Sequence, residues 1–234
     1  MKENKSVLIN EADLERWALL YRIAGYSAIG MILIIPIQIV VYMVYPVPES
    51  IESWFELFHN NWFIGLLHMD FLYIINILLL GVLYLAFYFS LRERNKTLIT
   101  VALFFGFVSI AAYLSSNTCF EMLFLSSHYY SATSEAVKAS YLAAGQGMIV
   151  TWVGTAFNVY YVLNAVVLII VASVMLQSPV YGKKIAITGL ISGLLMLIPS
   201  TAGNIGLIFS MASLIPWLIF AIMIAIKFLH LSKL

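Results

Sequence analysis

The sequence predicts an all-α integral membrane protein, a six-transmembrane-helix bundle with two short external interfacial helices. Three observations lead to this prediction. Apolar residue types make up 63% of the 234 residues and charged types only 10%, whereas soluble domains carry about 45–50% and about 25%. Six stretches are long and apolar enough to cross a bilayer, and the basic residues fall almost entirely on one side of them. A chain with so little polar surface cannot cover a globule in water.

The six stretches define one membrane domain over residues 1–234. A crossing helix needs about 20 predominantly apolar residues. The predicted spans, in chain order, cover residues 17–45, 62–91, 97–125, 148–176, 183–199 and 205–230. The fifth is the shortest. Several of the others exceed the minimum length, so we expect them to tilt or to extend beyond the lipid.

The basic residues predict the orientation of the chain. With six spans, the side that holds both ends of the chain receives all but one of the Lys and Arg residues: Lys2, Lys5, Arg16, Arg22, Arg92, Arg94, Lys96, Lys183, Lys184, Lys227 and Lys233. The opposite side receives only Lys138. Because short cytoplasmic loops are enriched in Lys and Arg, we expect a cell membrane protein with its N-terminus and C-terminus in the cytoplasm.

Two external segments have the pattern of short interfacial helices. In residues 51–58, Ile51, Trp54 and Phe55 share one helical face, and the glutamates share another. This pattern predicts an amphipathic helix in the membrane interface, with Trp54 at headgroup depth. Residues 134–146 form the second segment. Ser134 is its predicted N-cap, and Glu135 lies in the first turn, where the helix dipole favours an acid.

Composition and small residues limit the partners. The net charge is +1 without a basic stripe, so nucleic acid is not an expected partner. Cys119 is the only cysteine, which excludes an internal disulfide. Gly189 and Gly193 have the spacing that lets helices approach closely in lipid, and helix-mediated association through them is a predicted interaction.

Two acids within the spans are the main candidates for a binding site. An ionisable group at the bilayer centre costs about 2.5–3.5 kcal/mol, so it is a functional hypothesis by default. Asp70 lies near the external end of the second span and Glu121 near the external end of the third. Adjacent antiparallel spans usually pack together, which would bring both carboxylates into one pocket. One of the two is then expected to hold a proton or to bind a cation.

Other polar residues at similar depth would complete a polar cup open to the outside: Gln38, Tyr73, Asn76, Asn117, Asn158 and Asn204. His68 and His128 are candidate metal ligands, although no motif fixes their spacing, and the identity of any cofactor stays open. A structural interpretation stands beside this one. Asp70 would cap the second span, Glu121 would contact water at headgroup level, and the amides would join helices.

Three functional hypotheses follow. The favoured one is a small-molecule or ion binding protein, a transporter or sensor that uses the outer cup. The second is a structural or accessory membrane subunit. The third is an intramembrane metal-assisted hydrolase that uses His68, Asp70, Glu121 and His128. The sequence has no phosphate-binding Gly-rich loop, so ATP-driven work by this chain alone is not expected, and it has no nucleophile elbow. The hydrolase is the least favoured of the three hypotheses.

Three stretches carry a resemblance to a known family. They are residues 54–58 (Trp-Phe-Glu-Leu-Phe) with the segment that leads to Asp70, residues 141–145 (Tyr-Leu-Ala-Ala-Gly) followed by 154–157 (Gly-Thr-Ala-Phe), and residues 174–178 (Val-Met-Leu-Gln-Ser). The chain resembles the uncharacterised prokaryotic six-helix membrane proteins grouped as domain of unknown function 4386. Members often have an acid after the Ala-Ala-Gly run, where this chain has Gln146. The resemblance implies a six-helix membrane fold and brings no established activity.

Overall fold

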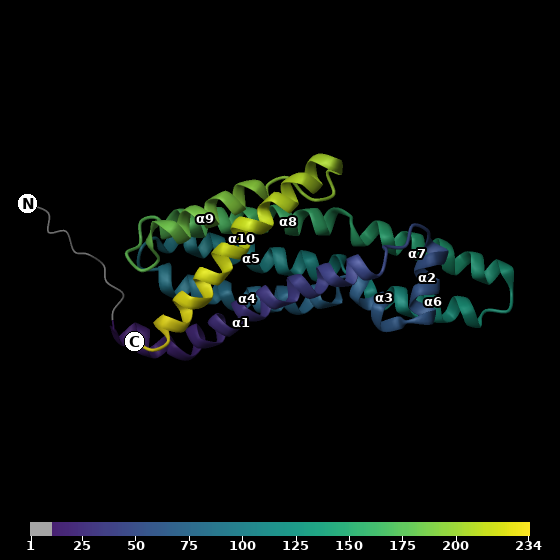
Figure 1. Cartoon of the computed structure of the whole chain (residues 1–234), viewed down its shortest axis with the longest axis horizontal. Coiled ribbons are helices and arrows are strands. Elements are labelled where there is room, and N and C mark those ends of the chain that lie inside the picture. Colours follow the sequence, from purple (N-terminus) through teal and green to yellow (C-terminus); the bar gives the residue numbers. More distant parts are fainter. Residues whose placement is uncertain (1–10) are drawn as a thin grey trace, which may run out of the picture. The chain divides into compact units, whose positions relative to one another are not determined.

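The computed structural model describes the backbone of residues 11–234 and the side chains of residues 15–234. This part of the chain is all-helical, without strands. Figure 1 shows its helices, which are, in order, α1 (Glu11–Val44), α2 (Ile51–Asn60), α3 (Trp62–His68), α4 (Phe71–Leu91), α5 (Lys96–Ser116), α6 (Cys119–Ser131), α7 (Glu135–Trp152), α8 (Thr155–Met175), α9 (Gly182–Leu195) and α10 (Gly203–Leu231).

Five stretches of the described chain are long and apolar enough to cross a membrane: Glu15–Val44, Phe71–Leu91, Lys96–Ser131, Glu135–Met175 and Gly203–Leu231. The predicted all-helical class is therefore confirmed, and the five stretches indicate a membrane protein. The predicted fifth span corresponds to α9. Its 14 residues rise about 21 Å, less than the hydrocarbon thickness of about 30 Å. The count of six spans is not confirmed and stays a prediction.

The contacts divide the chain into two compact units. Unit 1 consists of Met1–Ile32, Leu78–Ile110 and Val159–Leu234, and unit 2 consists of Leu33–Ile77 and Ala111–Asn158. Unit 1 therefore holds the first part of α1, most of α4, α5 and α8, and all of α9 and α10. Unit 2 holds α2, α3, α6 and α7 with the adjoining ends of the long helices.

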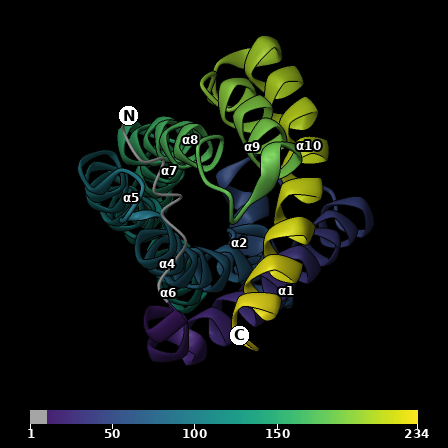
Figure 2. The same cartoon turned by 90° about the vertical axis from the view of Figure 1, so that its left-hand side faces the viewer.

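In unit 1, the connections that carry basic residues lie at one end. The α4–α5 connection, the α8–α9 connection and the C-terminal end of α10 share this end, on the left of Figure 1 and toward the viewer in Figure 2. Arg92 and Arg94 belong to the first connection, Lys183 and Lys184 begin α9, and Lys233 follows α10. This arrangement agrees with the grouping of basic residues in the sequence.

The predicted small-residue contact is made inside unit 1. A Cβ atom on Gly189 would lie 2.9 Å from the Phe220 ring of α10 and 3.1 Å from Cβ of Ala172 in α8. A Cβ atom on Gly193 would lie 2.8 Å from the side chain of Ile169 in α8. The two glycines thus let helices of one chain approach each other, and association with a second chain through them stays a prediction.

In unit 2, α2, α3, α6 and α7 pack around an apolar core. Its fully enclosed members are Trp54, Phe55, Phe58, Leu66, Met69, Cys119 and Met122. The predicted short helix at residues 51–58 is confirmed as α2, which begins with a capping box between Ser50 and Ser53. Its interfacial position is not confirmed, because Trp54 is only 4% exposed. The apolar face of α2 packs on protein, which shields it from water as lipid would.

The second predicted interfacial segment is part of a longer helix. Residues 135–146 belong to α7, which has 18 residues, and Ser134 occupies its N-cap position without a side-chain hydrogen bond to the helix.

Three of the predicted spans also contain a break where one helix was expected. The breaks separate α3 from α4 at residues 69–70, α5 from α6 at 117–118, and α7 from α8 at 153–154.

Candidate functional site

Asp70 lies at the break between α3 and α4 and turns the chain between them. Its φ angle is +61°, and it is the one non-glycine residue of the described chain with positive φ. This left-handed conformation costs most L-residues about 1–2 kcal/mol, although Asp and Asn tolerate it best. The Asp70 carbonyl oxygen accepts a hydrogen bond from the Tyr73 N–H at 2.9 Å and so begins α4. Such conformations concentrate at functional sites.

The side chain of Asp70 joins three segments of unit 2. Its Oδ1 accepts a hydrogen bond from the Tyr42 hydroxyl of α1 at 2.8 Å. Its Oδ2 accepts one from the indole Nε1–H of Trp152 in α7 at 3.0 Å. Neither bond goes to an N–H group of α4, so the side chain does not act as the helix cap that the structural interpretation predicts.

Aromatic contacts close a ring that contains this carboxylate. The Tyr42 ring lies 5.3 Å from the His68 ring, and the His68 ring lies 6.2 Å from Trp54. Trp54 in turn meets Trp152 edge-on at 5.9 Å. We call Asp70, Tyr42, His68, Trp54 and Trp152 the Asp70 ring, because each of them contacts the next and the last returns to Asp70.

The carboxylate of the Asp70 ring has no cationic partner in the described chain. The ion pairs of residues 15–234 join Arg92 to Glu93 and Lys138 to Glu135. Asp70 precedes the candidate span that starts at Phe71. Burial raises the pKa of its carboxyl group to about 6, and the hydrogen bonds from Tyr42 and Trp152 act in the opposite direction. The carboxylate is therefore largely ionised at pH 7 and uncompensated.

His68 is the second unusual group of the ring. It is 0% exposed, and neither of its ring nitrogens makes a well-formed hydrogen bond to any group in the described residues. Buried polar atoms nearly always have partners. Burial lowers the pKa of the imidazole, and the backbone of Tyr45 acts in the opposite direction. A neutral imidazole offers one N–H donor and one acceptor nitrogen.

Three amides of the predicted cup have structural partners at the helix breaks. Gln38 Nε2 donates to the Leu67 carbonyl oxygen at 2.9 Å, and Asn117 Nδ2 donates to the Met69 carbonyl oxygen at 2.9 Å. Asn158 Nδ2 donates to the Gly154 carbonyl oxygen at 2.8 Å. The Leu67 and Gly154 carbonyl oxygens also accept from the backbone N–H groups of Asp70 and Asn158, so these side chains add to the hydrogen bonds at the helix breaks. For these residues the structural interpretation agrees with the contacts.

The remaining cup residues are Tyr73, Asn76 and Asn204. The Tyr73 ring packs on Tyr113 at 5.5 Å. Asn76 is 2% exposed, and its Oδ1 accepts no hydrogen bond from the described residues. Asn204 is exposed in the first turn of α10 and belongs to unit 1.

Glu121 is exposed on α6 and does not share the hydrogen bonds of Asp70. It lines an open groove of about 450 Å³ with Phe120 and Phe124. His128 Nδ1 lies 2.9 Å from the Phe124 carbonyl oxygen of its own helix. Within the described residues, no group of three or more His, Cys, Asp or Glu side chains is placed to hold a metal ion.

Sequence reasoning found Asp70 and His68 but missed Tyr42, Trp54 and Trp152. Tyr and Trp are enriched at both membrane interfaces, so aromatic residues near the ends of spans have an ordinary explanation. Trp152 is the fifth residue of the predicted fourth span, close to its end, so the same explanation covers it. The only available signal was that an indole N–H that is shielded from water usually needs an acceptor.

The conformation of Asp70 leads to a stability prediction. Asp70→Gly and Asp70→Ala both remove the carboxylate, but only glycine adopts positive φ without strain. We expect Asp70→Gly to be more stable than Asp70→Ala by about 1 kcal/mol, measured as thermal unfolding in detergent. Gly147 is helical, and a methyl group added to it would meet nothing within 4 Å, so Gly147→Ala is expected to be neutral or stabilising. An alanine variant as stable as the glycine variant at position 70 would contradict the strained turn.

Comparisons with known proteins give no relative. No family model, no curated protein and no solved structure matches this chain. The resemblance to the prokaryotic six-helix family therefore stays a prediction.

Proposed function

We propose that the protein is a cell membrane protein that binds a small organic cation at the Asp70 ring, as a sensor or transporter. The observation that carries the proposal is the carboxylate of Asp70, which is ringed by aromatic side chains and has no basic partner in the described residues. An ionisable group of this kind in a membrane protein is by default a functional hypothesis.

The donor set favours an ammonium group over a metal ion. Aromatic faces and a carboxylate are the groups that recognise quaternary and protonated amines. Calcium takes about 6–8 oxygen ligands, and the ring supplies the two oxygens of Asp70 and the Tyr42 hydroxyl. The neutral donors Tyr42 and Trp152 orient the carboxylate without cancelling its charge. Asp70 is partly exposed and Tyr42 is 36% exposed, which supports access from the Tyr42 side.

The topology that we propose puts the Asp70 ring on the external side. It has six crossings, with α9 as the short fifth crossing and both termini in the cytoplasm. The basic connections at one end of unit 1 support it, because such connections are typical of the cytoplasmic side. The end of α1 and the α3–α4 break then belong to the opposite side.

The accessory-subunit hypothesis remains the second candidate, and a specific observation favours it. Both oxygens of Asp70 already accept hydrogen bonds, and Gln38 and Asn117 satisfy carbonyl groups beside it. In this view the ring only holds α1, α3 and α7 together. The hydrolase hypothesis has the least support, because the described residues offer no three-ligand group for a metal.

Cation binding is tested with tetramethylammonium and the variant Asp70→Asn. Asparagine tolerates positive φ, can accept from Trp152 and can donate to the Tyr42 oxygen, so the fold should survive. We expect tetramethylammonium to raise the melting temperature of the wild type saturably, with sodium chloride as the ionic-strength control, and to leave Asp70→Asn unchanged. Glu121→Gln removes an exposed acid and should keep the response. Native mass spectrometry of both proteins would identify a ligand retained through purification.

The outcomes of this experiment separate the two candidates. If tetramethylammonium stabilises the wild type and Asp70→Asn equally, the carboxylate takes no part in cation binding. A wild type that responds to no ammonium compound, beside an equally stable asparagine variant, would favour the accessory subunit.

The topology is tested by labelling single cysteines in intact cells with a membrane-impermeant maleimide. Cys119 is 0% exposed, so the wild-type protein serves as the unlabelled control. We expect Lys138→Cys to be labelled from outside, and Lys184→Cys and Lys233→Cys to be labelled only after the membrane is permeabilised. Labelling of Lys233→Cys from outside, with Lys184→Cys protected, would mean that α9 does not cross.

A further inference from the structure

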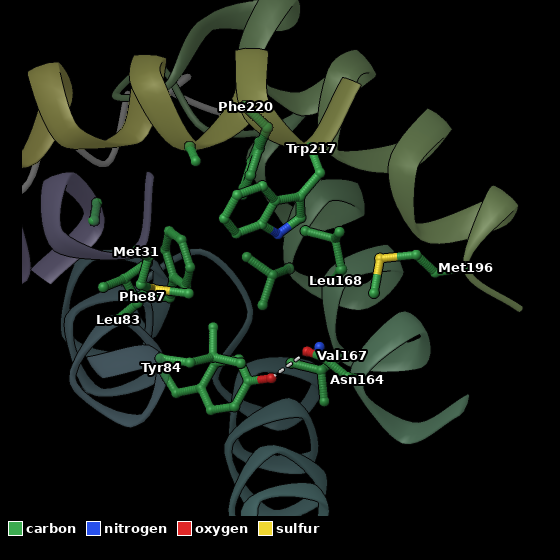
Figure 3. Close-up of a pocket in the computed structure, with 14 residues that line it drawn as sticks. Met31, Leu83, Tyr84, Phe87, Asn164, Val167, Leu168, Met196, Trp217 and Phe220 are labelled. Carbon is green, nitrogen blue, oxygen red and sulfur yellow. Dashed lines mark hydrogen bonds between the residues drawn. The ribbon is translucent and has the colours of Figure 1, made fainter. Parts of the chain in front are cut away.

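Helix α10 has an inward and an outward face in unit 1. Trp217 and Phe220 point inward, into a small inner pocket of about 40 Å³ (Figure 3). Ile226 follows Trp217 by about two and a half helical turns, so it lies on the opposite face, and it is 64% exposed. The inner pocket has room for about three waters and none for a lipid chain. Any lipid that α10 binds therefore lies on its outward face.

The outward face of α10 forms one wall of an open groove. The groove is lined by Met223, Ile226, Lys227 and His230 of α10 and by Ile185 of α9. The four residues of α10 recur at intervals of three and four, which places them on one side of the helix. The groove has a volume of about 300 Å³, at the lower end of the range of about 300–1,000 Å³ that is usual for ligand sites.

The groove contains a cation without an acidic partner. Lys227 is half-buried, and the ion pairs of residues 15–234 join other side chains. The sequence has no Asp or Glu after Glu135, so α8, α9 and α10 contain no acid. A charge in an apolar stretch is costly unless a partner or the interface compensates it. The compensating anion for Lys227 has to come from outside these helices.

Lys227 lies close to the level of the lipid headgroups. The apolar stretch Gly203–Leu231 ends four residues after it, about 6 Å further along the helix axis. Long basic side chains near the end of a span extend to the interface. Lys184, which directly precedes Ile185, is exposed at the same basic end of unit 1. Basic groups at this level attract the headgroups of anionic lipids.

The apolar and basic parts of the groove follow the order of the parts of a phospholipid. Met223 lies deeper in the apolar stretch than Lys227, and His230 lies one turn nearer its end. An acyl chain on the apolar wall would therefore end in a phosphate beside the basic side chains. A zwitterionic headgroup brings its own cation and compensates Lys227 less. A soluble anion would leave the apolar wall uncovered.

We infer that the groove between α9 and α10 binds one anionic phospholipid. Its phosphate lies beside Lys227 and His230, and an acyl chain lies along Ile185, Met223 and Ile226. The groove belongs to unit 1 and shares no residue with the Asp70 ring, so either site can exist without the other. The two sites also select opposite charges.

The test is native mass spectrometry of the full chain in a nonionic detergent, titrated with dioleoyl phosphatidylglycerol or with dioleoyl phosphatidylcholine. We expect tighter binding of phosphatidylglycerol to the wild type. Lys227→Gln should bind it about fivefold more weakly, the contribution of one basic group near an anionic lipid, and Lys227→Arg should keep the affinity. Lys233→Gln is the matched control, because it removes the same charge from the same end of α10 and Lys233 does not line the groove.

Measurements on the wild type keep the inference testable if the variants fold poorly. Equal affinity for the two lipids would overturn it, because the groove would then not recognise charge. Displacement of phosphatidylglycerol by glycerol 3-phosphate, which has the phosphate but no acyl chain, would overturn it in favour of a site for soluble anions. A dimer that forms without lipid and dissociates when phosphatidylglycerol is added would overturn it in favour of a second copy of the chain.

The matched control decides between the groove and a diffuse attraction. Equal weakening of phosphatidylglycerol binding in Lys227→Gln and Lys233→Gln would overturn the inference, since any basic group at this end would then contribute alike.

Discussion

The turn at Asp70 holds unit 2 together because one residue carries both the backbone direction and the hydrogen bonds between segments. Its left-handed conformation ends α3 and begins α4. Gln38 from α1 and Asn117 from the α5–α6 break donate to the Leu67 and Met69 carbonyl oxygens at this turn. The carboxylate itself joins Tyr42 and Trp152. The break therefore costs few hydrogen bonds, and an ionised, partly exposed acid is held beside aromatic side chains.

The sequence predicts the helices well and the breaks between them poorly. The apolar run at 205–230 identifies α10 closely, and the run at 17–45 identifies the end of α1 but not its start at Glu11. A bilayer leaves a helix as the only open structure that satisfies its backbone. The breaks at Asp70 and Asn117 have no proline to announce them. Their stability comes from side chains distant in sequence, such as the bond from Gln38 to the Leu67 carbonyl, and periodicity carries no information about such contacts.

The candidate site was also predictable only in part, because the residues that form it are distant in the sequence. An acid such as Asp70 is conspicuous in an apolar stretch, so composition alone identifies it. Its partners Tyr42 and Trp152 look like interfacial aromatic residues until the fold brings them to its two oxygens. Glu121 has the same sequence signature as Asp70, yet it is exposed on α6, because depth along a span does not determine which way a side chain faces.

The central claim is that the Asp70 ring offers negative charge to an organic cation. Isotope-edited infrared titration of the Asp70 carboxyl group tests it most directly, with Asp70→Asn to assign the band. We expect the carboxyl group to titrate near pH 6, since burial raises its pKa to about 6, and saturating tetramethylammonium to shift the titration to lower pH, because a bound cation favours the ionised form. A titration that tetramethylammonium leaves unchanged would contradict the account.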